Sequence, residues 1–171
     1  MGSILAEELG VIERTNPLLK VASSVKLFAG MDVGMLEKLL SCADKISIAG
    51  GELFFDEGDV GESFYVLVIG KVVVEQTNEG KWIRLARLAS GDSFGEMTLV
   101  DDKRRSARVR AETECVALYF PMERIKPFPA IMASLYLNIA RVLVKRLKTT
   151  NTVLLDLKAR APDSDEEVSG D

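Results

Sequence analysis

The sequence contains no histidine. Histidine is the commonest general base, a frequent ligand of haem iron and the usual partner of cysteine in zinc sites. Cys42 and Cys115 are the only cysteines, too few for a disulfide framework, an iron–sulfur cluster or a four-thiolate site. We therefore expect no metal, no haem, no iron–sulfur cluster and no enzyme activity, and two buried, unreactive thiols.

Long apolar runs and a broad basic face are missing as well. No apolar stretch reaches about 18 residues and no secretory leader is visible, which predicts a cytoplasmic protein that does not contact a membrane. The net charge is −4, but residues 162–171 include five acidic residues and no basic one, so the rest of the chain is close to +1. An anionic ligand must then be bound by a local site, and we expect that ligand to be small.

Short β-rich runs separated by glycine-containing turns make up the middle of the chain. We predict strands at residues 45–48, 52–55, 64–69, 71–76, 83–88, 107–111 and 115–120. Turn sequences such as Asn78-Glu79-Gly80 and Gly91-Asp92 supply the positive φ angles that tight turns need. This pattern predicts a mainly β fold with flanking helices, an eight-stranded β-roll of the double-stranded β-helix, jelly-roll-like kind.

Helical periodicity appears on both sides of the β section. We predict helical pieces at residues 3–13, 16–28 and 33–42 and one long helix from residue 130. The predicted domains are an N-terminal helical segment (1–25), the β-roll (26–130), a C-terminal helix (131–158) and an acidic, disordered tail (159–171).

The long helix carries a heptad seam. Its members follow steps of four and three residues: Tyr136, Ala140, Leu143, Leu147, Thr150, Leu154 and Leu157. This spacing fits a helix lying across its own β-roll or a two-stranded homodimer contact, and we favour the dimer. A polar Thr150 weakens the packing of the seam, which indicates a role other than stability.

Residues 91–107 contain the richest chemistry. Gly91-Asp92-Ser93-Phe94-Gly95 matches the G-x-S-x-G elbow of esterases, but that motif needs a strand–turn–helix in an α/β sheet. It also needs a histidine to activate Ser93, and the sequence has none. The hydrolase interpretation is therefore discarded.

A phosphate site explains the same segment better. Gly95-Glu96-Met97 can open a short helix whose free backbone N–H groups bind a phosphate. The Glu96 carboxylate can accept a hydroxyl of the ligand, and Arg105 can pair with phosphate oxygens. A sugar phosphate meets both requirements. The alternative is a plain salt bridge between Glu96 and Arg105.

The run GDSFGEMTL at 91–99, followed by Arg104-Arg105-Ser106-Ala107, resembles the phosphate-binding cassette of cyclic nucleotide-binding domains. The resemblance covers roughly residues 25–157 and is strongest to the effector domain of bacterial catabolite activator-like regulators. Those regulators continue into a helix-turn-helix domain, whereas this sequence ends soon after Leu157. We therefore expect no DNA binding by this chain alone.

The resemblance implies the role of each residue in the cassette. Arg105 would bind the cyclic phosphate and Glu96 the ribose 2′-hydroxyl. Gly95, Met97 and Ser106 would donate backbone N–H groups, and Ser106 could add its hydroxyl.

Further residues implied by the resemblance would contact the base. Val74 and Leu85 would pack on it from the strands, and Thr150, with Asn151 beside it, would reach it from the long helix. The implied ligand is cAMP, favoured over cGMP.

The expected function is a regulatory sensor that relays the presence of the ligand through its C-terminal helix, which acts as lid and dimer contact. A second copy of the chain and an unknown protein effector are the expected partners. The alternative is a dimeric scaffold that keeps the roll but binds no nucleotide.

Overall fold

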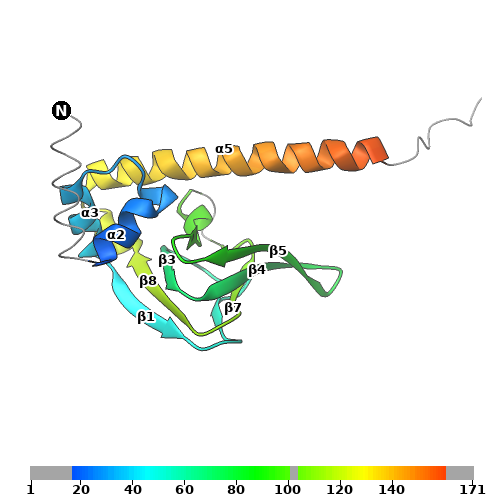
Figure 1. Ribbon diagram of the computed structural model, residues 1–171, viewed down its shortest axis with the longest axis horizontal. Helices are drawn as coiled ribbons and strands as arrows, with labels where there is room; N and C mark the ends of the chain where they lie inside the picture. The colour runs from blue at the N-terminus through cyan, green and yellow to red at the C-terminus, as the bar shows by residue number, and fades with distance from the viewer. Residues whose placement is uncertain (1–16, 101–103, 161–171) are drawn as a thin grey trace, which may run out of the picture. The chain divides into compact units, whose positions relative to one another are not determined.

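The computed structural model describes residues 17–100 and 104–160 (Figure 1). The chain divides into two compact units, Met1–Ile139 and Ala140–Asp171. Each unit is described by itself.

Two four-stranded antiparallel sheets form most of the first unit, as the β-roll prediction requires. The strands are β1 (Asp44–Ile48), β2 (Leu53–Phe55), β3 (Ser63–Ile69), β4 (Lys71–Asn78), β5 (Lys81–Ala89), β6 (Ser93–Phe94), β7 (Arg108–Ala111) and β8 (Cys115–Pro121). The strand order is β1-β8-β3-β6 in one sheet and β2-β7-β4-β5 in the other. Figure 1 shows β1 beside β8, and β4 beside β5.

Every predicted β-rich run corresponds to one of these strands. β6 was missed because it has only two residues, which pair with Tyr65 and Val66 of β3. This strand lies within the run 91–99 and ends directly before Gly95.

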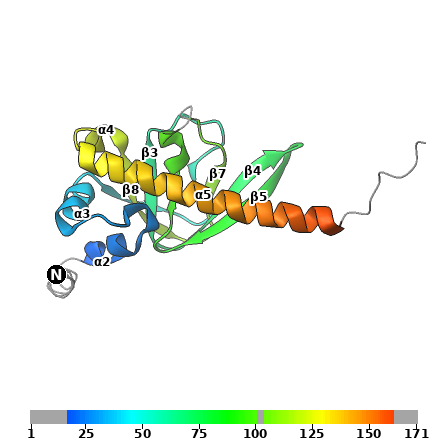
Figure 2. The same ribbon diagram turned by 90° about the horizontal axis from the view of Figure 1, so that it is seen from above.

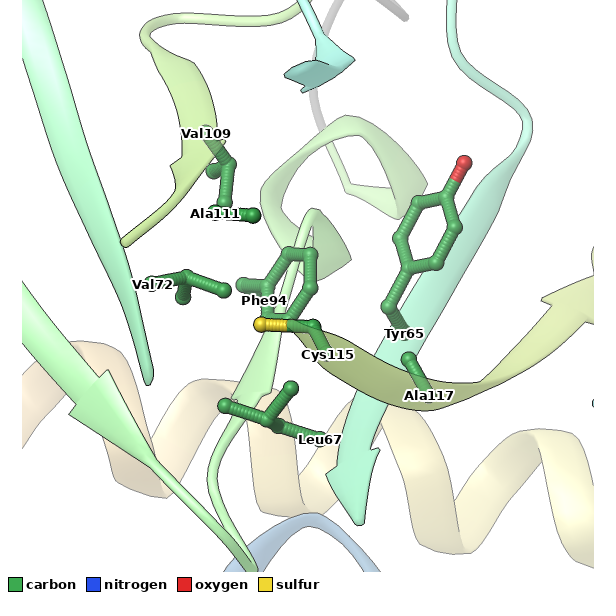
Figure 3. Close-up of a cluster of buried hydrophobic side chains, with 8 residues drawn as sticks. All are labelled: Tyr65, Leu67, Val72, Phe94, Val109, Ala111, Cys115 and Ala117. Carbon is green, nitrogen blue, oxygen red and sulfur yellow. The ribbon is translucent and has the colours of Figure 1, made fainter. Parts of the chain in front are cut away.

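A core of apolar side chains lies between the two sheets (Figure 3). Its buried members are Tyr65, Leu67, Val72, Phe94, Val109, Ala111, Cys115 and Ala117. The rings of Tyr65 and Phe94 stack with their centroids 5.2 Å apart, which joins β3 to β6. Cys42 and Cys115 are both buried and free, as predicted.

The helices at the N-terminal side differ in one respect from the prediction. Residues 16–28 do not form one helix: α2 (Pro17–Ser24) is followed by the 3-10 helix η1 (Lys26–Phe28). The break comes at Val25, whose backbone is extended with φ −73° and ψ 121°. α3 (Val33–Leu40) begins at Asp32, whose carboxylate accepts the Met35 N–H at 2.8 Å. The helix predicted at 3–13 lies outside the described residues.

The C-terminal helix α5 (Pro129–Arg160) is slightly longer than predicted and is preceded by α4 (Met122–Ile125). Within the first unit, Ile131, Leu135 and Ile139 are buried at spacings of four residues. The Asn138 amide donates to the carbonyl oxygens of Leu27 and Ala29, at 3.0 and 2.8 Å. These contacts fix the first turns of α5, which Figure 2 shows between α3 and α4.

The second unit comprises the rest of α5 from Ala140 on. Several apolar side chains of the predicted seam are exposed there, among them Leu147 (60%) and Leu154 (49%). The predicted tail falls outside the described residues from position 161 on. Among the helices of the described part, none is long and apolar enough to cross a membrane.

Candidate anion-binding site

The loop after β6 opens a single turn of 3-10 helix, η2 (Glu96–Leu99), at the position where the sequence predicts a short helix. Gly95 precedes this turn with φ 79°, a left-handed conformation that favours glycine. A Cβ at this position would also lie 2.6 Å from Nη1 of Arg105. Glycine is therefore required at residue 95 for both its backbone conformation and its small size.

Arg105 is the most unusual residue of the site, because its side chain is charged and only 5% of the residue is exposed. Its Nη1 donates to the carbonyl oxygens of Gly95 (2.7 Å) and Ser63 (2.9 Å), with the Thr98 hydroxyl at 3.3 Å. Its Nη2 donates to the Ser63 hydroxyl at 3.0 Å. Every one of these acceptors is neutral.

The guanidinium fits because two positions around it lack side chains. A Cβ on Gly61 would lie 2.2 Å from Nε and 2.3 Å from Cζ of Arg105, closer than real contacts allow. Cζ of Arg105 lies 4.1 Å from the centroid of the Phe55 ring and 5.9 Å from that of the Tyr65 ring, and both are cation–π distances. Glycine and aromatic neighbours thus form a cradle for this one cation.

The charge of Arg105 is poorly compensated. Burial lowers the pKa of Arg105 from its ordinary value, and the acidic groups of Tyr65, Tyr119, Asp59 and Glu96 oppose that shift. Within residues 17–100 and 104–160, no carboxylate forms an ion pair with Arg105, and its buried Nε has no hydrogen-bond partner. The alternative of a Glu96–Arg105 salt bridge is therefore wrong for the described structure.

The other cassette residues lie around the same loop. Glu96 is 2% exposed, whereas Met97 is 39% exposed. Ser106, directly after Arg105, is exposed, and its hydroxyl lies 4.0 Å from the Met97 sulfur. The structure thus brings Gly95, Glu96 and Met97 to the same place as Arg105 and Ser106.

The two strand residues predicted to contact the base differ in their surroundings. Val74 is partly buried and packs against the core cluster between the sheets. Leu85 is 55% exposed and lies at a β-bulge, since Val74 pairs with Ala86 but Glu75 pairs with Arg84. Their contact with a base stays a prediction.

Thr150 and Asn151 are exposed on the part of α5 that belongs to the second unit. Their approach to the ligand and the lid role of the helix therefore stay predictions.

A separate, apolar groove lies between α3 and the start of α5, far in sequence from the cassette. It is lined by Asp32, Gly34, Met35, Lys38, Pro127, Phe128, Pro129, Ala130 and Ile131. The Lys38 ammonium lies over the Phe128 ring, 4.5 Å from its centroid, in a cation–π contact. Arg105 is the candidate residue for an anion site, because its cation is buried and its Nε has no partner among the described residues. Within the described part of the chain, no cluster of acidic or thiol side chains could hold a metal ion.

The residues that surround Arg105 were not predicted from the sequence to belong to the site: Phe55, Gly61, Ser63 and Thr98. Ser63 lies 42 positions from Arg105, so only the folded chain brings the two together. Thr98 lies within the run 91–99, and its hydroxyl, which is buried in the structure, was the one signal available in the sequence. Its Oγ1 donates to the Gly95 carbonyl oxygen at 3.1 Å and accepts from Arg105.

The chain matches the family model of the cyclic nucleotide-binding domain over residues 45–129. The Cyclic AMP receptor protein of Thermus thermophilus is 32% identical over 133 residues, which are 75% of this chain and 60% of that protein. The cGMP-dependent protein kinase 2 of Homo sapiens is 34% identical over 96 residues, 55% of this chain and 13% of the kinase.

A solved structure shows the same fold. The crystal structure of Thermus thermophilus Catabolite Activator Protein aligns with a TM-score of 0.69 at 30% identity, covering 78% of this chain and 63% of that one. This chain therefore spans less than two thirds of the length of each relative. Through residues 45–129, the chain belongs to the cyclic nucleotide-binding domain family.

Proposed function

We propose that the site around Arg105 binds the phosphate of a cyclic nucleoside monophosphate. The observation that carries this proposal is a buried guanidinium which, among the described residues, is held only by neutral acceptors and has no partner for its Nε. A buried charge without a counter-ion is costly to a protein. An anionic ligand would supply the missing charge and accept from the unused donors.

The cassette residues complete the binding site in this proposal. The backbone N–H groups of Gly95, Met97 and Ser106 add donors to the phosphate, and the Glu96 carboxylate accepts the ribose 2′-hydroxyl. A phosphate without an attached sugar would meet the buried Glu96 carboxylate and be repelled. Because the site pairs a cation with a carboxylate, it favours a sugar phosphate over an inorganic one.

In this proposal the base lies against Val74 and Leu85, and Thr150 and Asn151 supply polar groups that recognise it. We favour cAMP over cGMP, because a relative named for cyclic AMP aligns over more of this chain than the cGMP-dependent kinase does. Nucleotide binding shifts the population of placements of α5, and two copies of the chain associate through the exposed seam of that helix.

A scaffold that binds no nucleotide is the second candidate. The exposed apolar side chains of α5 would suit it, since they offer a surface for association. Such a scaffold gains nothing from a buried arginine with unused donors, and this favours the sensor.

Calorimetric titration with cAMP and with cGMP tests the proposal. We expect heat of binding for the wild type and, for Arg105→Ala, a loss of about 2–5 kcal/mol, which is more than tenfold in affinity. Arg110→Ala is the matched control, because it removes an arginine that is already paired with Glu75. Absence of binding for both nucleotides would favour the scaffold, and equal loss in both variants would contradict the role of Arg105.

A further inference from the structure

The donors of Arg105 are unevenly used. A guanidinium has five N–H groups, two on each Nη and one on Nε. Nη1 faces three acceptors, which account for both of its N–H groups. In the part of the chain that the structure describes, Nη2 has one acceptor, the Ser63 hydroxyl, and Nε has none. One Nη2–H and the Nε–H are therefore left for a ligand.

The position of Ser63 decides which N–H groups stay available. Its carbonyl oxygen accepts from Nη1 and its hydroxyl from Nη2, so Ser63 occupies the end of the guanidinium between these two nitrogens. The remaining Nη2–H points to the other side, parallel to the Nε–H. Such a parallel pair of N–H groups matches two oxygens of a phosphate.

The Thr98 hydroxyl fixes the same end of the group from the cassette side. It donates to the Gly95 carbonyl oxygen, which also accepts from Nη1. Ser63 and Thr98 are both 5% exposed, so water does not compete for these hydrogen bonds. Both side chains are neutral and hold the cation without cancelling its charge.

We infer that Ser63 and Thr98 are positioning residues, which orient Arg105 so that its Nε–H and one Nη2–H form a two-pronged contact with the ligand phosphate. The inference rests on the function proposed above. It predicts that the two exocyclic oxygens of a cyclic phosphate are distinguished by a guanidinium that cannot turn.

Phosphorothioate analogues of cAMP test this orientation, since sulfur replaces one or the other exocyclic oxygen in the two diastereomers. We expect the wild type to prefer one diastereomer by about tenfold, because the held guanidinium offers different N–H groups to the two exocyclic positions and sulfur is the weaker acceptor at the better of the two. Ser63→Ala is expected to weaken cAMP binding about tenfold and Thr98→Val about threefold, and both reduce the diastereomer preference. Thr98→Ser keeps the hydroxyl and is expected to retain both properties.

A merely structural role for the two hydroxyls would lower affinity but leave the diastereomer preference unchanged, and that result would overturn the inference. Circular dichroism spectra of all variants serve as the control for folding.

A ligand-free measurement separates this inference from the proposed function. In side-chain NMR spectra of the wild type, a held Arg105 gives separate, slowly exchanging signals for its Nη protons, assigned with Arg105→Lys. These signals should average in Ser63→Ala. If the wild type binds neither cyclic nucleotide but shows this pattern, the proposed nucleotide binding is contradicted while the positioning of Arg105 stands. Averaged signals in the wild type would contradict the positioning itself.

Discussion

Arg105 and the pair formed by Arg108 and Arg110 lie within six residues of the sequence but have opposite surroundings. Arg105 is buried and held by neutral oxygen atoms. Arg108 and Arg110 of β7 reach across to β4, where both pair with the Glu75 carboxylate, at 2.9 and 3.0 Å. The Arg108 guanidinium also stacks 3.5 Å from the Trp82 ring centroid.

The difference teaches how to separate a binding cation from a structural one. In the Glu75 cluster the hydrogen bond from Arg110 leads the effects that lower the pKa of the Glu75 carboxyl, and the same bond raises the pKa of Arg110. Each charge there has a partner. Burial instead lowers the pKa of Arg105, and its Nε has no partner in the described structure. The charges of the first cluster are paired with one another across the sheet, whereas Arg105 is the cation that we propose binds an anion.

The largest effect outside Arg105 itself is expected from Gly61→Ala. The added methyl group would meet Nε, Cζ and Nη2 of Arg105 at 2.2 to 2.6 Å, so the guanidinium must move. The backbone at Gly61 is not left-handed, so the effect is one of space alone. We expect cyclic nucleotide affinity, measured by calorimetry, to fall about tenfold or more.

Gly34→Ala provides the control for that substitution. It lies in α3, where a Cβ would have its nearest neighbour at 3.5 Å, an ordinary contact. We expect it to raise the free energy of unfolding by about 0.5–1 kcal/mol and to leave binding unchanged. If Gly61→Ala binds as well as Gly34→Ala, the cradle does not fix Arg105.

A smaller effect, on stability only, is expected from Glu75→Gln. The change leaves Arg108 and Arg110 without their counter-ion in a partly buried cluster. We expect the free energy of unfolding to fall by about 1–2 kcal/mol in chemical denaturation, with nucleotide affinity unchanged. A large loss of affinity without loss of stability would reverse the roles of the two arginine groups.

The pH dependence sharpens the same comparison. The folded pKa of Glu75 lies below its ordinary value, so its stabilisation is complete above the ordinary carboxyl pKa of about 4.3. This stabilisation is lost as the pH falls through the lowered pKa of Glu75 in the folded protein. The stability difference between the wild type and Glu75→Gln should therefore be largest near neutral pH and shrink in acid; a difference that grows in acid would contradict the assignment.

Much of the fold followed from the pattern of the sequence. Alternation of apolar and polar residues located the strands, because the side chains of a half-buried strand point to opposite faces in turn. The same alternation was also present from Arg105 on: Arg105, Ala107, Val109 and Ala111 are buried, with less buried residues between them. This periodicity separates Arg105 from Arg108 and could have been used to predict its burial.

The cradle around Arg105 could not be predicted in the same way. Gly61 precedes β3, Ser63 is its first residue and Phe55 ends β2. No local pattern connects them to a loop some 40 residues later. Their contacts depend on how the two sheets pack. β6 escaped prediction for a related reason, because a two-residue strand has no alternation to detect.

The most direct test of the central claim is the ¹⁵N spectrum of arginine side chains during titration with cAMP. We predict that the Arg105 Nε–H signal, absent in Arg105→Lys, shifts on binding and shows coupling to the ligand ³¹P across a hydrogen bond. If cAMP binds while this signal stays where it is in the free protein, Arg105 does not receive the phosphate and the account is contradicted.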